Sequence, residues 1–295
     1  MDNEFHVFGF KFKWRNTLIT LGIAAAVLIV LLLIDMYLMP ISWYGVIIGT
    51  AFLVALLLAT QTFPLRNLPS DYPYDLVWWV FPLSIIFARA YYVVNSLSEF
   101  HSFYDVIAVW NGGLAIFGGI IGGIIAILIC SKIKKHNAID TADCIAPLLL
   151  LAQSIGRWGN FVNQEVFGKE VVSKAWQWFP FAVHIENGAF SGWFLATFFY
   201  ESIINLAGFF ILMTILRKVN LRGFATCCYL IYEGFIRYFL ESLRVPEYIL
   251  YIPGTKFPVS QAVSLGMIFV GIVGIVIITI IRNKKNAKNN QTVNT

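Results

Sequence analysis

The feature that most constrains this chain of 295 residues is a series of eight apolar runs, most of them close to 20 residues long. A helix needs about 20 apolar residues to cross the hydrocarbon core of a bilayer, so each run predicts one membrane-spanning helix. Charged residues make up only 13% of the chain, against roughly 25% in an average soluble domain. The sequence therefore predicts an all-α polytopic membrane protein and excludes the soluble globular, disordered and secreted disulfide-rich classes. The predicted spans are Thr17–Met39, Trp43–Thr62, Leu76–Val94, Gly112–Cys130, Asp140–Ile155, Thr197–Leu216, Phe224–Leu243 and Val259–Ile281.

Basic residues gather in five short segments beside these runs and predict the orientation. Short loops rich in Lys and Arg face the cytoplasm, and the five segments hold 14 of the 21 basic residues. With all five inside, alternate loops face inward and both termini are cytoplasmic. The net charge of +5 is therefore a topology signal, and we expect no nucleic-acid partner. The basic residues of the five segments are Lys11, Lys13, Arg15, Arg66, Lys132, Lys134, Lys135, Arg217, Lys218, Arg222, Arg282, Lys284, Lys285 and Lys288.

Composition divides the chain into three parts. Residues 1–40 hold a cytoplasmic N-terminus and a first transmembrane anchor, because the run there is long for a signal peptide and no small-residue cleavage site follows it. Residues 41–282 form the main membrane domain. Residues 283–295 form a basic, Asn-rich tail that we expect to be disordered. The longest stretch outside the runs, 156–196, is rich in aromatic residues, which favours a position in the headgroup region.

Four arginines lie in or near the outward halves of the predicted spans: Arg89, Arg157, Arg237 and Arg244. Charge inside a bilayer is tolerated mainly when it is paired, buried or hydrated. A guanidinium group binds phosphate through two parallel hydrogen bonds. These residues therefore predict a polar, outward-opening cavity that binds a phosphate.

Carboxylates accompany the arginines on the seventh predicted span. Glu233, Arg237, Glu241 and Arg244 recur at a spacing that places them on one helix face. A self-neutralising ladder of ion pairs is the structural alternative to a ligand site. Glu201, near the start of the sixth span, is a further candidate partner for an arginine.

The densest polar stretch, 156–168, follows the fifth predicted span on its outer side. Its glycines, Gly156, Gly159 and Gly168, permit tight turns and close approach of the backbone to a ligand. Its hydrogen-bonding side chains are Arg157, Asn160, Asn163, Gln164 and Glu165. An interfacial loop with ordinary turn residues is the alternative, although it explains the arginine less well.

Paired glycines mark the fourth predicted span, at Asn111-Gly112-Gly113 and again at Gly118-Gly119 and Gly122-Gly123. Small residues let membrane helices pack closely. The same glycines leave room for an acyl chain or a lipid headgroup against bare backbone. The sequence leaves both interpretations open.

Together these stretches resemble bacterial prolipoprotein diacylglyceryl transferases. The segment from Gly156 to Glu165, with Gly168, resembles the long signature of that family, and the resemblance extends from about residue 41 to 282. The other matching stretches are Trp43-Tyr44-Gly45, Ala88-Arg89-Ala90-Tyr91-Tyr92, Asn111-Gly112-Gly113, Phe199-Tyr200-Glu201-Ser202, the helix from Arg237 to Arg244, and Ser260-Gln261.

The resemblance implies a reaction and its place in the cell. Family members move the diacylglyceryl group of phosphatidylglycerol onto the lipobox cysteine of a prolipoprotein, forming a thioether and releasing glycerol phosphate. No metal or cofactor is implied. We expect phosphatidylglycerol, prolipoproteins and membrane lipids as partners, and a multi-pass protein of the bacterial cytoplasmic membrane whose site faces the outer leaflet. The family core has seven spans, so this chain carries an additional span at its N-terminus.

The resemblance also implies roles for particular residues. Arg157 and Arg237 are expected to clamp the phosphate, with Asn160 and Glu165 orienting Arg157 or the headgroup and Glu241 holding the arginine of the seventh span. Tyr44 is expected to hydrogen-bond the headgroup. The remaining residues expected to contact substrate are Glu201, Arg244, Gly112, Gly113 and Gly168.

Two positions depart from the family pattern. Many members carry His or Tyr between the two glycine pairs, where this chain has Phe117, so a general base at that position is excluded. Glu201, Glu165, Tyr44 and water remain candidates. The usual Tyr-Gly before the arginine helix reads Tyr232-Glu233 here, which adds a carboxylate that can pair with an arginine.

Other functional classes remain as alternatives. A non-catalytic phospholipid-binding paralogue shares every feature except activity. An anion transporter fits the arginines, but the chain shows no internal repeat and no matched pair of broken helices. An intramembrane protease is weaker, because Asp140 and Asp143 have no facing aspartate in the sequence pattern.

Overall fold

The computed structural model describes residues 4–7, 9–13, 42–97, 100, 102–109 and 112–293. Helices dominate these residues, as the sequence predicts for an all-α membrane protein. The predicted first span, Thr17–Met39, and Asn111 lie outside the described residues. The helices are α2 (Trp43–Thr62), α3 (Tyr72–Asn95), α4 (Phe103–Ile107), α5 (Ile116–Lys134), α6 (Ala138–Val162), α7 (Thr197–Lys218), α8 (Phe224–Glu241) and α9 (Val259–Val293), with short 3-10 turns η1 (Phe63–Arg66), η4 (Lys174–Trp176) and η5 (Pro246–Tyr248).

Each predicted span within the described residues is a helix. Six of them are long and apolar enough to cross a membrane: α2 (with η1), α3, α5, α6, α7 and the first 28 residues of α9. The seventh, α8, carries three charged residues, Glu233, Arg237 and Glu241, within its 18 residues. The prediction of a polytopic membrane protein is therefore confirmed. Helix α8 contributes charged side chains to the helix bundle.

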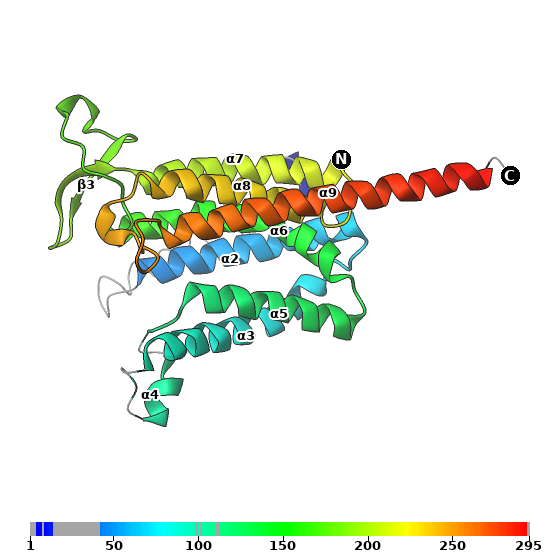
Figure 1. Cartoon of the computed structure of the whole chain (residues 1–295), viewed down its shortest axis with the longest axis horizontal. Coiled ribbons are helices and arrows are strands. Elements are labelled where there is room, and N and C mark those ends of the chain that lie inside the picture. The colour runs from blue at the N-terminus through cyan, green and yellow to red at the C-terminus, as the bar shows by residue number, and fades with distance from the viewer. Residues whose placement is uncertain are drawn as a thin grey trace.

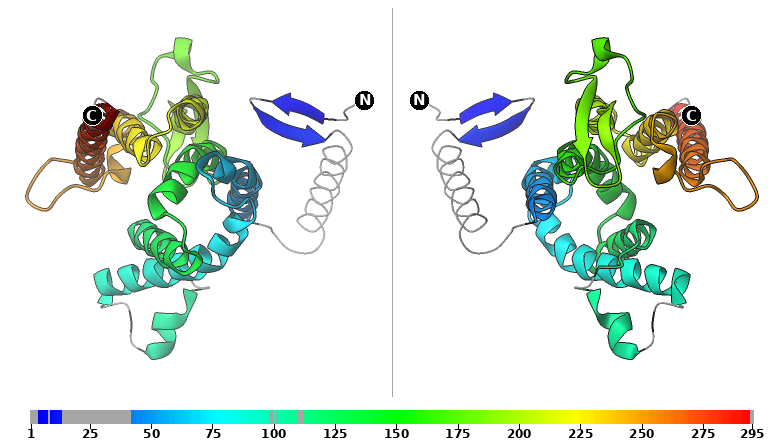
Figure 2. Two further views of the ribbon diagram at one scale, coloured as in Figure 1. Left: turned by 90° about the vertical axis from the view of Figure 1, so that its right-hand side faces the viewer. Right: turned by 90° about the vertical axis from the view of Figure 1, so that its left-hand side faces the viewer.

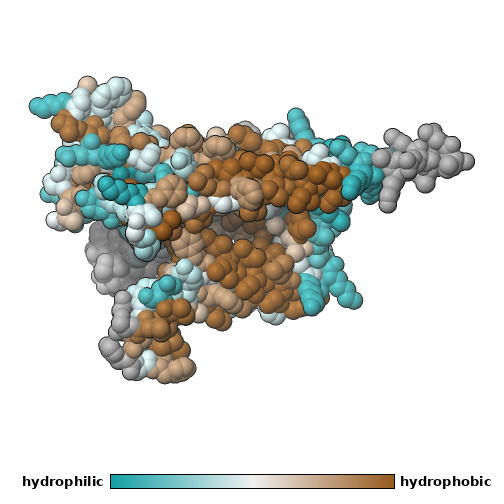
Figure 3. Space-filling model, in the orientation of Figure 1, coloured by the Kyte–Doolittle hydropathy of each residue, from teal (hydrophilic) through white to brown (hydrophobic). Residues whose placement is uncertain are grey.

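The long helices run side by side, roughly along one axis (Figure 1). Strand β3 and the start of α7 lie at one end, and both chain termini lie at the other (Figure 1). The surface in that orientation is apolar along the middle of the helices and hydrophilic at both ends (Figure 3). An apolar middle between two hydrophilic ends is the pattern that a bilayer imposes on a multi-pass protein.

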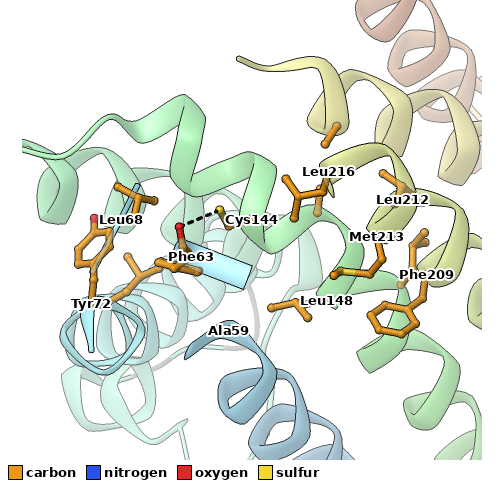
Figure 4. Close-up of a cluster of buried hydrophobic side chains, with 14 of the residues drawn as sticks. Ala59, Phe63, Leu68, Tyr72, Cys144, Leu148, Phe209, Leu212, Met213 and Leu216 are labelled. Atoms are coloured by element: carbon orange, nitrogen blue, oxygen red, sulfur yellow. Dashed lines mark hydrogen bonds between the residues drawn. The ribbon is translucent and has the colours of Figure 1, made fainter. Parts of the chain in front are cut away.

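Helix α6 occupies the centre of the bundle, packed against α2, α7 and α8, while α3 packs on α5 and α8 on α9 (Figure 2). The apolar core joins these elements: Phe63, Leu148 and Leu212 lie in one buried cluster (Figure 4). Within it, the Cys144 thiol donates to the carbonyl oxygens of Thr62 at 3.4 Å and Phe63 at 4.0 Å. This cysteine therefore contributes to packing between α6 and α2.

Two aspartates near the start of α6 hold the loop between α7 and α8. The carboxylate of Asp143 accepts hydrogen bonds from the Gly223 amide at 2.7 Å, the Thr226 amide at 2.9 Å and the Thr226 hydroxyl at 2.8 Å. Arg66 lies 3.7 Å from the same carboxylate, and Asp140 pairs with Arg222 at 3.0 Å. Both aspartates thus have structural partners, which removes the basis for the protease reading.

We expect Asp143→Ala to lower the free energy of unfolding by about 3 kcal/mol, because it leaves buried donors and the Arg66 charge without their acceptor. The measurement is the thermal midpoint of the purified protein in detergent. Asp143→Asn, which keeps an acceptor oxygen, should lose less. An unchanged midpoint for the alanine variant would contradict this anchoring role.

Glycines bring α5 into close contact with α3. A Cβ atom on Gly118 would lie 2.2 Å from the carbonyl oxygen of Phe87, and one on Gly122 would lie 2.4 Å from that of Leu83. Gly119 and Gly123, by contrast, have room for a methyl group. For Gly118 and Gly122, close helix packing is therefore the correct interpretation of the glycine pairs.

Gly122→Leu is expected to separate α3 from α5 and to reduce the yield of folded protein severely. Gly123→Leu is the matched control, since a Cβ atom there meets its nearest neighbour at an ordinary 3.6 Å. Size-exclusion chromatography after detergent extraction measures both. Equal yields of the two variants would show that the close approach does not limit folding.

Several segments differ from the sequence prediction. Residues of the N-terminal part form an antiparallel hairpin, β1 (Glu4–Val7) with β2 (Phe10–Lys13), and the aromatic-rich stretch contains a second, β3 (Ala182–Glu186) with β4 (Ser191–Leu195). The alternation of buried and exposed residues along β3 is the strand signal that the apolar content of the surrounding sequence obscures. Helix α9 also continues to Val293, where the sequence predicts a disordered tail.

Candidate active site

The polar signature segment begins inside a helix, because α6 extends to Val162. The prediction of turns at Gly156 and Gly159 is wrong. These glycines instead let α2 pack closely against α6. A Cβ atom on Gly159 would lie 2.8 Å from the ring of Tyr44, and one on Gly156 would lie 3.2 Å from Ile48. Helical geometry then places Gln153, Arg157 and Asn160 on one face of α6.

Arg157 is held by side chains from two directions. Its Nη2 atom forms an ion pair with Oε1 of Glu201 on α7, and its Nη1 atom donates to Oδ1 of Asn160 at 3.3 Å. The Asn160 amide in turn donates to Oε1 of Glu165 at 3.1 Å. Glu201 is only 5% exposed. The predicted partnership with Glu201 and the predicted orienting chain through Asn160 and Glu165 are both present.

The second pair of arginines is held by the carboxylates of α8. Nε of Arg237 lies 2.8 Å from Oε1 of Glu233, and Nη1 of Arg244 lies 3.2 Å from Oε2 of Glu241. The expectation that Glu241 holds Arg237 is therefore wrong; Glu233, one turn earlier, takes that place. A ladder of ion pairs does exist along α8, but Glu201 of α7 also interacts electrostatically with Arg237 and Arg244. Glu201 thus forms an ion pair with Arg157 and lies within electrostatic range of Arg237 and Arg244.

Arg89 does not join this group. Its guanidinium donates to backbone carbonyls of the segment that follows α3: Asp105 at 2.5 Å, Val106 at 2.9 Å, Gly112 at 2.7 Å and Gly113 at 3.0 Å. The prediction that all four arginines line one cavity is therefore wrong: the hydrogen bonds of Arg89 hold a loop, and of the other three only Arg157 is among the residues that line the cavity described below.

The neighbouring glycines, Gly112 and Gly113, take positive φ values of 84° and 70°. A Cβ atom on Gly113 would lie 2.5 Å from Nη1 of Arg89, so this glycine serves the same loop. Gly112 has open space on its Cβ side. Of the two, only Gly112 keeps the geometry expected of a residue that a substrate approaches.

Gly168 pairs through its backbone with two other segments at the end of the site nearest β4. Its amide donates to the Leu195 carbonyl at 2.9 Å, and it forms an antiparallel bridge with Arg244. A Cβ atom at this position would lie 2.6 Å from Leu195 and 2.8 Å from Thr197. Gly168 therefore joins the segment after α6 to the start of α7 and the end of α8.

Burial lowers the pKa of the Arg244 guanidinium from its ordinary value, and Glu241 opposes that shift.

A cavity of about 520 Å³ lies between α2, α3 and α6. Its polar lining residues are Tyr44, Gln153, Arg157 and Asn160, and the rest of its wall is apolar. Such a cavity suits an amphiphile whose polar group lies at the arginine and whose apolar part lies along α2 and α3. Gln153 is not among the residues predicted from the sequence, although a glutamine within the apolar run 145–155 is a visible signal.

Phe117 lies on the α3–α5 pair, where its ring is tilted against Tyr91 at a centroid distance of 6.3 Å. The side chain is 44% exposed. It supplies apolar surface and no proton-transfer group. Among the described residues, no group of three or more His, Cys, Asp and Glu side chains is placed to hold a metal ion.

Most of the chain is similar to proteins of known function. The family described as prolipoprotein diacylglyceryl transferase matches residues 30–277. A phosphatidylglycerol–prolipoprotein diacylglyceryl transferase of Clostridium perfringens is 41% identical over 237 residues, covering 79% of this chain and 88% of its own length. Enzymes of the same name from Listeria monocytogenes and Streptococcus agalactiae are each 38% identical, covering 79% of this chain and 83% and 90% of their own lengths.

Each line of observation leads to the same assignment. The matched region contains the arginines of α6 and α8, Glu201 and the wall of the cavity. The similarity covers most of each relative's length as well as most of this chain. The chain therefore belongs to the prolipoprotein diacylglyceryl transferase family.

Proposed function

We propose that this protein transfers the diacylglyceryl group of phosphatidylglycerol to the lipobox cysteine of a prolipoprotein. The observation that carries the proposal is the position of Arg157, held by Glu201 and Asn160 at the polar end of a largely apolar cavity. A phospholipid has the same division between a phosphate and apolar chains. The names of the relatives supply the two substrates.

The reaction explains why cations are needed at that point. The cysteine sulfur attacks the glycerol carbon that carries the phosphate; a carbon–sulfur bond forms and the carbon–oxygen bond to phosphate breaks. The phosphodiester carries one negative charge, and the departing glycerol phosphate carries a second. Fixed cations beside the leaving oxygen stabilise the charge that develops in the transition state. Arg157 and Arg237 are the residues that we assign to this role.

The remaining residues position these cations. Glu201 holds Arg157 and interacts electrostatically with Arg237, so it keeps two like charges close together. Asn160 and Glu165 fix the second edge of the Arg157 guanidinium. Tyr44 packs on Gly159 at the cavity wall, where its hydroxyl can reach a headgroup. The thiol proton leaves to Glu165, Glu201, Tyr44 or water, since Phe117 accepts none.

We place the site toward the outer leaflet of the bacterial cytoplasmic membrane. The basic ends of α5 and α7 lie at the end of the bundle opposite β3, whereas Arg157 lies near the C-terminal end of α6, and basic loops face the cytoplasm (Figure 1). A lipobox cysteine becomes accessible on the outer side once its precursor has been exported. At the level of the outer leaflet, the arginines can contact both the phospholipid headgroup and the lipobox cysteine.

The test is transfer by the purified protein in detergent. Phosphatidylglycerol is mixed with a lipobox peptide or with its Cys→Ser counterpart, and mass spectrometry detects the diacylglyceryl adduct. An adduct on the cysteine peptide alone supports the transferase. Folded protein that binds phosphatidylglycerol but forms no adduct would support a lipid-binding paralogue. Anion flux in vesicles without adduct would support a transporter.

Lys256 provides the control for surface charge. It lies exposed in the loop before α9, away from the cavity wall. Lys256→Ala is expected to change the transfer rate by less than about twofold, since an isolated surface charge contributes little. A large loss in this variant would mean that the site has been misplaced.

A further inference from the structure

Two buried oxygen atoms beside the arginines have no hydrogen-bond donor among the described residues: Oε1 of Gln153 and Oε2 of Glu233. Glu233 is only 2% exposed. Buried acceptors are almost always paired, because leaving them unpaired costs free energy. Gln153 lines the cavity and Glu233 contacts Gln153. The two free acceptors are therefore a site for a donor that the ligand brings.

The other atoms of the two side chains fix their orientation. Nε2 of Gln153 donates to Oε1 of Glu233 at 3.3 Å and to the Tyr229 hydroxyl at 3.4 Å. The amide nitrogen must face the carboxylate, because the amide oxygen would meet it acceptor to acceptor. Oε1 of Glu233 also accepts from Arg237. Each side chain thus has one end held in place and one oxygen free.

We infer that Gln153 and Glu233 form the subsite for the hydroxyl groups of the phosphatidylglycerol headgroup, the free oxygens accepting hydrogen bonds from its terminal glycerol. The inference rests on the proposed function and assigns a specificity role to Gln153, which lies outside the signature segment, and to Glu233, where this chain departs from the family pattern. Phosphatidylglycerol presents two hydroxyls, which matches two acceptors. Glycerol phosphate leaves the site with these hydroxyls still attached.

The spacing along α6 agrees with this assignment. Gln153 lies four residues before Arg157, on the same helix face and in the same cavity wall. Four residues correspond to a rise of about 6 Å along the helix axis. A headgroup whose phosphate lies at Arg157 can therefore extend its three-carbon glycerol to the next turn. The charge of Glu233 is balanced by Arg237, so the subsite needs no cationic headgroup.

The first experiment uses the unaltered protein and three lipids with identical acyl chains: phosphatidylglycerol, a phosphatidyl-propanediol with one headgroup hydroxyl, and phosphatidylpropanol with none. Transfer to the lipobox peptide is followed for each. We expect kcat/KM to fall by at least about threefold with the first hydroxyl removed and at least about tenfold with both removed, the loss that one or two hydrogen bonds produce.

The second experiment replaces the acceptor. In Gln153→Leu and Gln153→Met, the preference for phosphatidylglycerol over phosphatidylpropanol should fall below about threefold, because the acceptor that distinguishes the two lipids is lost. Gln61→Leu is the matched control: Gln61 is at the other end of α2 and hydrogen-bonds Lys11. This control should keep the full preference.

The outcomes separate the two proposals. Equal use of all three lipids by the unaltered protein would overturn the headgroup subsite while leaving the transferase intact. So would a preference that survives in both Gln153 variants. No adduct with any lipid would instead contradict the proposed function. If the Gln153 variants fail to fold, the three-lipid series on the unaltered protein still decides the matter.

Discussion

Arg157→Ala is expected to slow diacylglyceryl transfer by about a thousandfold, the loss typical of removing a preorganised group that stabilises developing negative charge. The guanidinium of Arg157 lies at the polar end of the cavity, where the negative charge of the leaving phosphate develops. Arg157→Lys keeps the charge but loses the planar fork, so it should also lose about a hundredfold. The measurement is kcat/KM for the lipobox peptide with phosphatidylglycerol.

Folding has to be separated from chemistry in this variant, because Glu201 is buried and would lose its partner. Removing one member of a buried pair costs about 3–5 kcal/mol of stability. The double variant Arg157→Ala, Glu201→Gln removes both charges and should recover much of the thermal midpoint without recovering transfer. More than a tenth of the original activity in folded Arg157→Ala protein would refute the phosphate clamp.

The second large effect is expected for Arg237→Ala. Transfer should fall by about a hundredfold or more, because a cation beside the departing phosphate is lost. Stability should fall by about 2 kcal/mol, because Gln153 is then the only hydrogen-bond donor to Glu233 among the residues that the structure describes. The double variant Arg237→Ala, Glu233→Gln should restore stability but not transfer.

Arg222→Ala is the matched arginine control for this experiment. Arg222 pairs with Asp140 beyond the other end of α8, and its side chain is 70% exposed. An exposed ion pair contributes at most about 1 kcal/mol, so this variant should transfer at nearly the original rate. Equal losses in Arg222→Ala and Arg237→Ala would indicate that charge in general, rather than charge at the site, controls the activity.

The helices and the ion-paired character of the site could be predicted from the sequence because both depend on local signals. Apolar runs of about 20 residues define spans by length alone. The spacing of Glu233, Arg237, Glu241 and Arg244 defines one helix face. The wrong assignment of Glu241 to Arg237 arose because i,i+4 and i,i+3 partners are equally close on a helix. Choosing between them depends on the rotamers that packing allows.

The errors share a different physical cause. Gly156 and Gly159 suggested turns because glycine is flexible in isolation, whereas here the packing of Tyr44 and Ile48 from α2 decides their conformation. Arg89 suggested a ligand site because it lies near the outward half of a predicted span, yet backbone carbonyls from residues 105–113 accept its hydrogen bonds. Contacts that cross between distant segments leave no periodic trace in the sequence.

The bridge between Gly168 and Arg244 has a consequence for how the bundle moves. With the hydrogen bond from Gly168 to Leu195, it fastens the end of α6 to the start of α7 and the end of α8, while Asp143 fastens α6 to the start of α8 near the opposite end. The three helices that carry the charged groups therefore behave as a single stiff block, and spreading them apart would break backbone pairing. The cavity lies on the other side of α6, where α2 packs on α6 and α3 packs on α5. Parting α3 with α5 from α2 would widen the cavity without breaking that backbone pairing.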